Sequence, residues 1–322
     1  MSGAEGPEDR ERREDRPRPS RRSLLRGGAI LAGGVVAGAG GAAVWHGVAG
    51  DRPGQPYIPE EFSAPKPRKT PGFDHLVVLM GENRSFDTLL GYLYTPDDPP
   101  PGGSFEGLAF GDHSNRAEDG TVVPAHVYTG PTDRIMRQPD PDPGEEYPHV
   151  NTQLFGSLDA HNRGREVGEM REPYNAPRAG QRTTMSGFVL DYEADFEGRT
   201  GRKPTARERD QIMGSFGPEM LPVTSTLARE FGVYDHWFCA VPSQTFCNRS
   251  FFHASTSHGY VTNQHGGGYE KWLKAAPPPT VFNRLEEAGL SWRVYFDELQ
   301  LVSFTGVIHA PVLERYWKTD RF

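Results

Sequence analysis

Two short apolar runs, each followed at once by a polar turn, constrain the fold of this chain more than any other feature. The first is His75 to Met80, which ends at Gly81, and the second is Val233 to Val241, followed by the turn Pro242 to Arg249. Such continuous runs are typical of strands buried on both faces of a parallel sheet. In open α/β sheets the ligand crevice lies just beyond the carboxyl ends of these strands. The sequence therefore predicts an α/β fold with its functional groups in the two turns.

Helices and loops are expected around these runs. Apolar residues at helical spacing predict a helix over Leu221 to Phe231 and another over Val281 to Ala288, which Gly289 ends. A further helix is expected within Ser85 to Tyr92, and Trp292 to Phe296 alternates like a strand. Residues 95–150 are rich in Pro, Gly and Asp and predict long loops.

Composition favours one large, loop-rich enzyme domain. Hydrophobic residues make up 35% of the 322 positions and aromatic residues 11%, enough for a sizeable core. The 38 glycines and 29 prolines interrupt the apolar patterning and predict extensive surface loops, where catalytic groups tend to lie. The net charge of -8 and the lack of a basic block after residue 70 argue against a nucleic-acid partner.

The first fifty residues predict export. Arg21 and Arg22, followed by two leucines and Arg26, precede a weakly apolar run from Gly27 to Ala43. This order is similar to a twin-arginine signal, which sends folded proteins out of the cytoplasm. The alternative is a membrane anchor, although a stable span needs roughly 20 strongly apolar residues. We expect a signal region over 1–50, a linker over 51–72, a domain over 73–322, and a secreted or cell-envelope location.

The turn after the first run offers oxygen ligands and a cation. Glu82 and Asn83 can each give one oxygen to a hard divalent metal ion. Arg84 can meet a phosphate with its planar guanidinium. The alternative is a helix-capping cluster in which Asn83 or Ser85 caps the helix and Asp87 favours its positive end.

The turn after the second run offers hydroxyl groups. Ser243 and Thr245 carry hydroxyls, and Arg249 adds a positive charge. A hydroxyl beside a metal ion loses its proton more readily and becomes a nucleophile toward phosphorus. The alternative is that both hydroxyls only cap a helix that starts near Asn248. The histidines, His149 among them, have no zinc-protease spacing.

Seven segments in order carry a resemblance to a known family. They are M-G-E-N-R-S-F-D (80–87), E-Y-P-H-V-N-T-Q-L-F-G (146–156), M-S-G-F-V (185–189), I-M-G-S-F (212–216), L-P-V-T-S-T-L-A-R-E-F-G-V-Y-D-H-W-F (221–238), S-Q-T-F-C-N-R (243–249) and V-F-N-R-L-E-E-A-G-L-S-W-R-V-Y (281–295). Together they resemble the bacterial phosphoesterase family of non-haemolytic phospholipases C and a related acid phosphatase. The resemblance implies an alkaline-phosphatase-like three-layer sandwich with a mostly parallel sheet.

The resemblance also implies roles for single residues. Glu82 and Asn83 match ligands of a divalent metal ion, and Thr245 matches the family's phosphate nucleophile beside that metal. Arg84 and Arg249 would offset charge on the phosphate, and the residues expected to bind substrate are His149, Asn248 and Ser243. The implied activity is phospholipase C cleavage of phospholipids with peripheral membrane contact, where exposed aromatics such as Phe246 or Trp237 would meet the acyl chains. The alternatives are an acid phosphatase and a truncated, non-catalytic phosphate or lipid binder.

This sequence departs from the family pattern at three places. Cys247 replaces a proline of the second turn, and a Cys239–Cys247 disulfide would restore the lost rigidity, the alternative being two buried thiols. Glu145 stands where the family often has a phosphate-contacting histidine. The family's later acidic pair and histidine are not matched before Phe322, so we expect the C-terminal part of the domain to be missing; Asp297 and Glu298 are weak substitutes.

Overall fold

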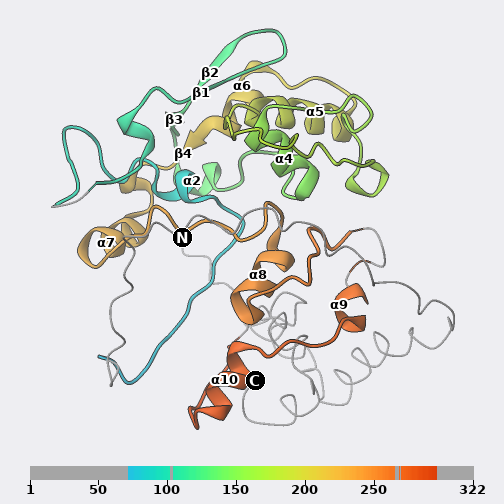
Figure 1. Ribbon diagram of the computed structural model, residues 1–322. Coiled ribbons are helices and arrows are strands. Elements are labelled where there is room, and N and C mark those ends of the chain that lie inside the picture. Colours follow the sequence, from blue (N-terminus) through green and yellow to red (C-terminus); the bar gives the residue numbers. More distant parts are fainter. Residues whose placement is uncertain (1–71, 102–103, 265–267, 269, 296–322) are drawn as a thin grey trace, which may run out of the picture. The chain divides into compact units, whose positions relative to one another are not determined.

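The computed structural model describes residues 72–101, 104–264, 268 and 270–295 (Figure 1). Contacts between residues divide the chain after Val77 into two units, and the second unit holds every helix and strand given below. The predicted signal region, residues 1–50, lies outside the described residues. None of the helices among the residues that the structure describes has the length and apolarity to span a bilayer.

The second unit combines short helices with two small sheets. The α-helices are α2 (Phe86–Leu90), α3 (Thr132–Ile135), α4 (Tyr147–Phe155), α5 (Phe188–Thr200), α6 (Ala206–Asp210), α7 (Pro222–Glu230), α8 (Thr245–Ala254), α9 (Glu270–Lys274) and α10 (Val281–Glu287). The 3-10 helices are η2 (Leu108–Phe110), η3 (Val167–Glu169), η4 (Gln211–Met213) and η5 (Pro218–Met220). The strands are β1 (Ser114–Arg116), β2 (Val122–Pro124), β3 (His126–Val127) and β4 (Gly214–Ser215). β1 pairs with β2 in antiparallel fashion, and β3 pairs with β4 in parallel.

The helices expected from local sequence signals are confirmed. Ser85 caps α2, because its hydroxyl accepts a hydrogen bond of 3.1 Å from the backbone of Thr88. α7 begins with Pro222, a residue suited to the first turn because it has no amide hydrogen to satisfy. Thr280 caps α10 through a capping box, and Gly289 follows the helix with a φ of +70°.

The predicted strands are wrong for the described residues. His75 to Met80 has no regular structure, and Val77 and Leu79 are 89% and 96% exposed. Val233 to Val241 is also irregular, and residues 292–295 form no strand, while Phe296 lies outside the described residues. A strand needs a neighbour that takes up its backbone hydrogen bonds, and no described strand pairs with these segments. The described part is therefore a mixed helix and strand structure rather than one large parallel sheet.

The core lies in several clusters, of which two concern the predicted site. α4 and α5 pack together, and Tyr192 and Phe196 of α5 are almost fully buried (Figure 1). A second cluster joins Phe246 of α8 to Trp272 of α9, whose rings meet edge to face at 4.8 Å. This contact fixes the first turn of α8, where the predicted nucleophile lies.

Candidate active site

Glu82 is the residue through which the two predicted turns meet. Its Oε2 accepts a hydrogen bond of 2.6 Å from the hydroxyl of Thr245, and its Oε1 accepts one of 2.5 Å from Nη2 of Arg249. Thr245 and Arg249 are four residues apart on α8, so both side chains reach the same face of the helix. The carboxylate thus holds a hydroxyl and a guanidinium side by side.

The start of α8 adds positive electrostatic character to this cluster. The helix begins at Thr245, three residues before the expected start near Asn248, and no side chain caps it. The first amide groups of a helix have no partner within the helix, and its dipole places partial positive charge there. Neither Ser243 nor Thr245 acts as a helix cap, which removes the alternative reading of these hydroxyls.

Asn248 and Ser243 support the turn rather than face open space. The Asn248 amide bonds to the backbone of Val241, Ser243 and Gln244, so its predicted role in substrate binding is not supported. The side-chain oxygen of Ser243 is buried, which leaves Thr245 as the available hydroxyl of the turn.

The predicted disulfide is absent, because the two cysteines occupy different environments. Cys239 is exposed, whereas Cys247 is completely buried against Val241 and Trp272. Burial raises the pKa of the Cys247 thiol to about 11, against a smaller opposing effect of the Ser243 hydroxyl. Cys247 is therefore held by packing in the core and not by a covalent bond.

Arg84 does not join the cluster, and its catalytic role stays a prediction. Its Nη2 donates a hydrogen bond of 2.7 Å to the carbonyl of Met136, and its guanidinium lies 5.9 Å from the ring centre of Phe216. The side chain therefore ties the first turn to the segment after α3. Asn83 is exposed, and among the described residues its amide has no hydrogen-bonding partner.

His149 lies in the core, away from open surface. It is 5% exposed, and its Nδ1 lies 3.0 Å from Oδ1 of Asp191 on α5. Gln153 donates hydrogen bonds of 2.8 Å to Asp191 Oδ2 and to the Gly144 carbonyl. Burial alone would lower the pKa of His149, but the bond to Asp191 and its charge outweigh burial and raise it. The pair joins α4 to α5, and a role of His149 in substrate binding stays a prediction.

Glu145, an acidic residue in the loop before α4, is affected by the charge of Glu82. Burial raises the pKa of its carboxyl, and the negative charges of Glu146, Asp142 and Glu82 add to this effect. The residue was singled out from the sequence only as a departure from the family pattern. Its position beside other acids could not be read from the sequence, because it depends on how the loop before α4 folds.

The donors around Glu82 have the chemistry of a divalent-cation site but not a full ligand set. Carboxylate, amide and hydroxyl oxygens are ligands that Mg²⁺ and Ca²⁺ prefer. Among the residues that the structure describes, however, no three His, Cys, Asp or Glu side chains form a group that could hold a metal ion. Glu82 and Thr245, which are joined by a hydrogen bond, fit a hard cation as partial ligands, and Asn83 stays a predicted one. Asp297 and Glu298 lie outside the described residues.

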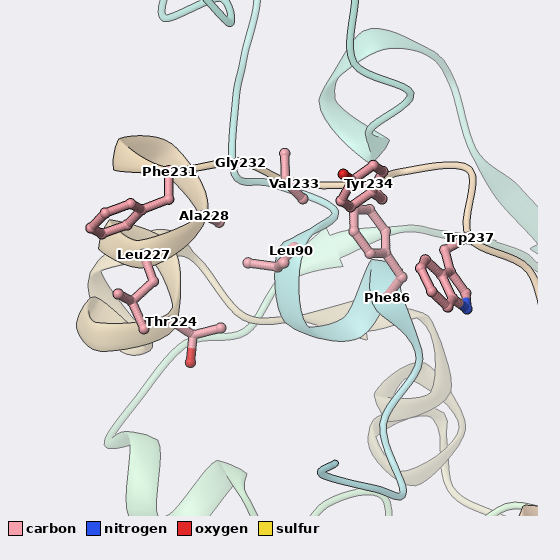
Figure 2. A pocket seen from close by; sticks show the side chains of 10 residues that line it. All are labelled: Phe86, Leu90, Thr224, Leu227, Ala228, Phe231, Gly232, Val233, Tyr234 and Trp237. Atoms are coloured by element: carbon pink, nitrogen blue, oxygen red, sulfur yellow. The ribbon is translucent and has the colours of Figure 1, made fainter. Parts of the chain in front are cut away.

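An apolar groove lies between α2 and α7. Figure 2 shows Phe86 and Leu90 of α2 and Leu227 of α7 facing this groove, with Trp237 at one end. Trp237 is 74% exposed, in keeping with an aromatic side chain available for contact. Phe246, the other aromatic residue expected to meet acyl chains, is 1% exposed and belongs to the core.

Comparison with known protein families shows which family the chain belongs to. Residues 73–320 match the model of the Phosphoesterase family, and the chain belongs to this family. It is 31% identical over 240 residues to non-specific phospholipase C1 of Arabidopsis thaliana, covering 74% of this chain and 37% of that protein. Non-specific phospholipase C3 of the same plant is 32% identical over 221 residues, covering 69% of this chain and 36% of that protein.

A bacterial relative agrees with the plant proteins. Non-hemolytic phospholipase C of Burkholderia pseudomallei is 28% identical over 256 residues, covering 75% of this chain and 29% of that protein. The matched part thus spans about a third of the length of these curated relatives. The predicted membership of the phosphoesterase family is confirmed.

Proposed function

We propose that this chain belongs to an exported, metal-assisted phospholipase C in which Thr245 is the nucleophile that attacks phosphorus. The observation that carries the proposal is the hydrogen bond of 2.6 Å from the Thr245 hydroxyl to Glu82. A threonine is a weak nucleophile unless a neighbouring group lowers the cost of removing its proton. The carboxylate of Glu82 is placed to orient that proton away from the attacking lone pair.

The protein's own groups account for each step after substrate binding. Thr245 Oγ1 attacks phosphorus in line and passes its proton to Glu82. The bond from phosphorus to the glycerol oxygen breaks, and this oxygen takes the proton from Glu82 and departs as the alcohol of diacylglycerol. The phosphorylated head group is then esterified to Thr245. Arg249 and the positive end of α8 balance the charge on the non-bridging oxygens. Water then attacks phosphorus, releases the phosphorylated head group and restores the threonine. Glu82, Asn83 and Thr245 would hold a divalent cation, which when bound would supply positive charge that lowers the proton affinity of the hydroxyl.

A phospholipid is the substrate that we favour. The relatives described above are named phospholipases C. The groove that includes Trp237 offers apolar surface for acyl chains. The products would be diacylglycerol and a phosphorylated head group, and the enzyme would contact membranes peripherally. An acid phosphatase would instead prefer a small monoester. Comparing bis(p-nitrophenyl) phosphate with p-nitrophenyl phosphate separates these activities, and lack of turnover of either would indicate a non-catalytic binder.

The proposal extends to the fold and the location of the protein. We infer an alkaline-phosphatase-like sandwich, a fold that the match to the Phosphoesterase family supports. The arginine pair at Arg21 and Arg22 supports export by the twin-arginine machinery to the cell envelope or beyond. Fusing residues 1–50 to a reporter that folds in the cytoplasm tests this, and replacing both arginines by lysine should abolish export of the reporter.

Substitution of Thr245 tests the nucleophile. Thr245→Ala should lower kcat for the diester by about 10³-fold or more, because no phosphoenzyme can form. Thr245→Ser keeps the hydroxyl and should retain measurable turnover with a burst of the first product. Wild-type turnover by the alanine variant would move the attack to Ser243 or to water.

A further inference from the structure

The side chain of Asn248 closes the turn that precedes the proposed nucleophile. Its Nδ2 donates to the carbonyls of Ser243 (2.8 Å), Val241 (3.1 Å) and Gln244 (3.2 Å). Its Oδ1 accepts a hydrogen bond of 3.0 Å from the amide of Val241. One side chain therefore binds the backbone N–H and the backbone carbonyl of Val241, together with two further carbonyls.

Only a carboxamide of this length matches that set of partners. Two N–H groups and one carbonyl oxygen on the same short side chain meet three backbone acceptors and one backbone donor. An aspartate would present negative charge to the three carbonyls. An alanine would remove the side-chain partner of the Ser243 carbonyl and of the Val241 amide, whereas the carbonyls of Val241 and Gln244 also accept from the backbone amides of Ser243 and Asn248. The hydrogen-bonding groups of the turn therefore account for an asparagine at position 248.

Two other residues of α8, Thr245 before Asn248 and Arg249 after it, make the contacts to Glu82. Thr245 lies at the first position of α8, directly after the clamped turn, and Arg249 follows Asn248 in sequence. Consecutive helical residues point about 100° apart, so Asn248 faces the turn while Arg249 faces Glu82. The path of residues 241–244 thus sets where the Thr245 hydroxyl stands relative to that carboxylate.

We propose that Asn248 is a positioning residue, which holds the Thr245 hydroxyl in the attacking position by clamping residues 241–244. This inference rests on the proposed role of Thr245. It assigns Asn248 no contact with substrate, so its loss acts on the rate of the chemical step and not on affinity for the ester. A displacement of about 1 Å at a reacting atom can lower a rate by about 10²-fold.

Kinetics of Asn248→Ala and Asn248→Asp test the proposal, with Asn115→Ala as the matched control. Asn115 also uses both ends of its amide on backbone groups, donating to Met185 and accepting from Phe188 and Val189, but it ties β1 to the start of α5. All proteins are measured at a temperature where circular dichroism shows them fully folded. The readouts are kcat, KM and the burst amplitude for bis(p-nitrophenyl) phosphate.

The expected result is a fall of about 10²-fold in kcat for both Asn248 variants, with KM changed less than about threefold and a reduced burst rate. Asn115→Ala should lose thermal stability but keep kcat. Wild-type kcat in folded Asn248→Ala, or a loss confined to KM, would overturn the positioning role while leaving Thr245 in place. Retained turnover by Thr245→Ala in the same assay would instead defeat the nucleophile assignment, and with it the inference.

Discussion

Thr245 and Glu82 are 163 positions apart in the sequence, yet the threonine hydroxyl donates a hydrogen bond of 2.6 Å to the carboxylate. Both residues belong to turns that follow apolar runs, and neither run forms a described strand. The contact therefore does not depend on a sheet in the described part of the chain. It follows instead from the anchoring of α8 by Phe246 and from the reach of Glu82.

The Glu82 carboxylate should be needed both for turnover and for cation dependence. We expect Glu82→Gln to lower kcat/KM for the diester by about 10²- to 10³-fold, since the neutral amide cannot accept the proton or bind a hard cation well. Treatment with a chelator should inactivate the wild type, and added divalent cation should restore it but not Glu82→Gln. Glu270→Gln, which alters an exposed acid on α9 paired with Lys274, is the matched control.

Chelator-resistant activity in the wild type would contradict the metal-assisted mechanism. Direct cation binding measured by calorimetry gives a readout that does not depend on turnover. Equal binding by the wild type and by Glu82→Gln would place the cation away from Glu82.

Arg249 should contribute to both stability and turnover, because its partner Glu82 is only partly exposed. Arg249→Gln removes a charge-assisted hydrogen bond of 2.5 Å and should destabilise the fold by about 1–2 kcal/mol. It should also lower kcat by about 10²-fold if the guanidinium balances phosphate charge. Arg249→Lys keeps the positive charge but lacks the planar guanidinium, so its stability and its kcat should lie between those of the wild type and Arg249→Gln.

A double-mutant cycle separates the contact from the catalytic effect. Urea unfolding should show that the double variant loses less stability than the sum of the losses in Glu82→Gln and Arg249→Gln, because the contact is lost only once. Additive losses would mean that the two side chains do not interact in solution. Arg202, paired with Glu208 on the exposed surface, offers a control pair with a smaller expected coupling.

His253 should make the protein sensitive to acid. Burial, helped by the nearby charge of Arg249, lowers the pKa of its imidazole to about 4, and its ring stacks on Phe282 of α10 at 5.6 Å. The unfolded chain, with a pKa near 6.5, then binds a proton before the folded protein does, so stability falls as the pH drops from about 6.5 toward 4. The loss reaches about 3 kcal/mol at pH 4.

Thermal midpoints between pH 4 and pH 8 test this for His253. His253→Gln should be less stable than the wild type near pH 7 but should show a shallower decline on acidification. Parallel pH curves for the two proteins would mean that another group governs the acid limb.

Local signals predicted the helices well, whereas the strands needed partners that the sequence does not reveal. The cap at Ser85, the first-turn Pro222 and the terminal Gly289 each act within a few residues, so the sequence alone locates α2, α7 and α10. The apolar runs at 75–80 and 233–241 satisfy the pattern of buried strands, but hydrogen bonds to distant segments decide whether strands form.

For the site, the order of the motifs predicted which two turns come together, but it did not predict the directions of their side chains. Glu82 and Arg84 are two positions apart, yet one meets Thr245 and the other the carbonyl of Met136. Asn248 and Arg249 diverge in the same way. Burial of His149 beside Asp191 depended on the packing of α4 against α5, which no local pattern specifies.

The contrast between the two cysteines has a practical consequence for following this protein. A maleimide dye reacts with thiolates, and a buried thiol with a pKa of about 11 supplies almost none at neutral pH. Labelling would therefore mark Cys239 alone and leave Cys247 untouched in the folded state. The chain carries a ready-made, single attachment point for a fluorophore six positions before Thr245, close enough in sequence to report on events at that turn without any engineered cysteine.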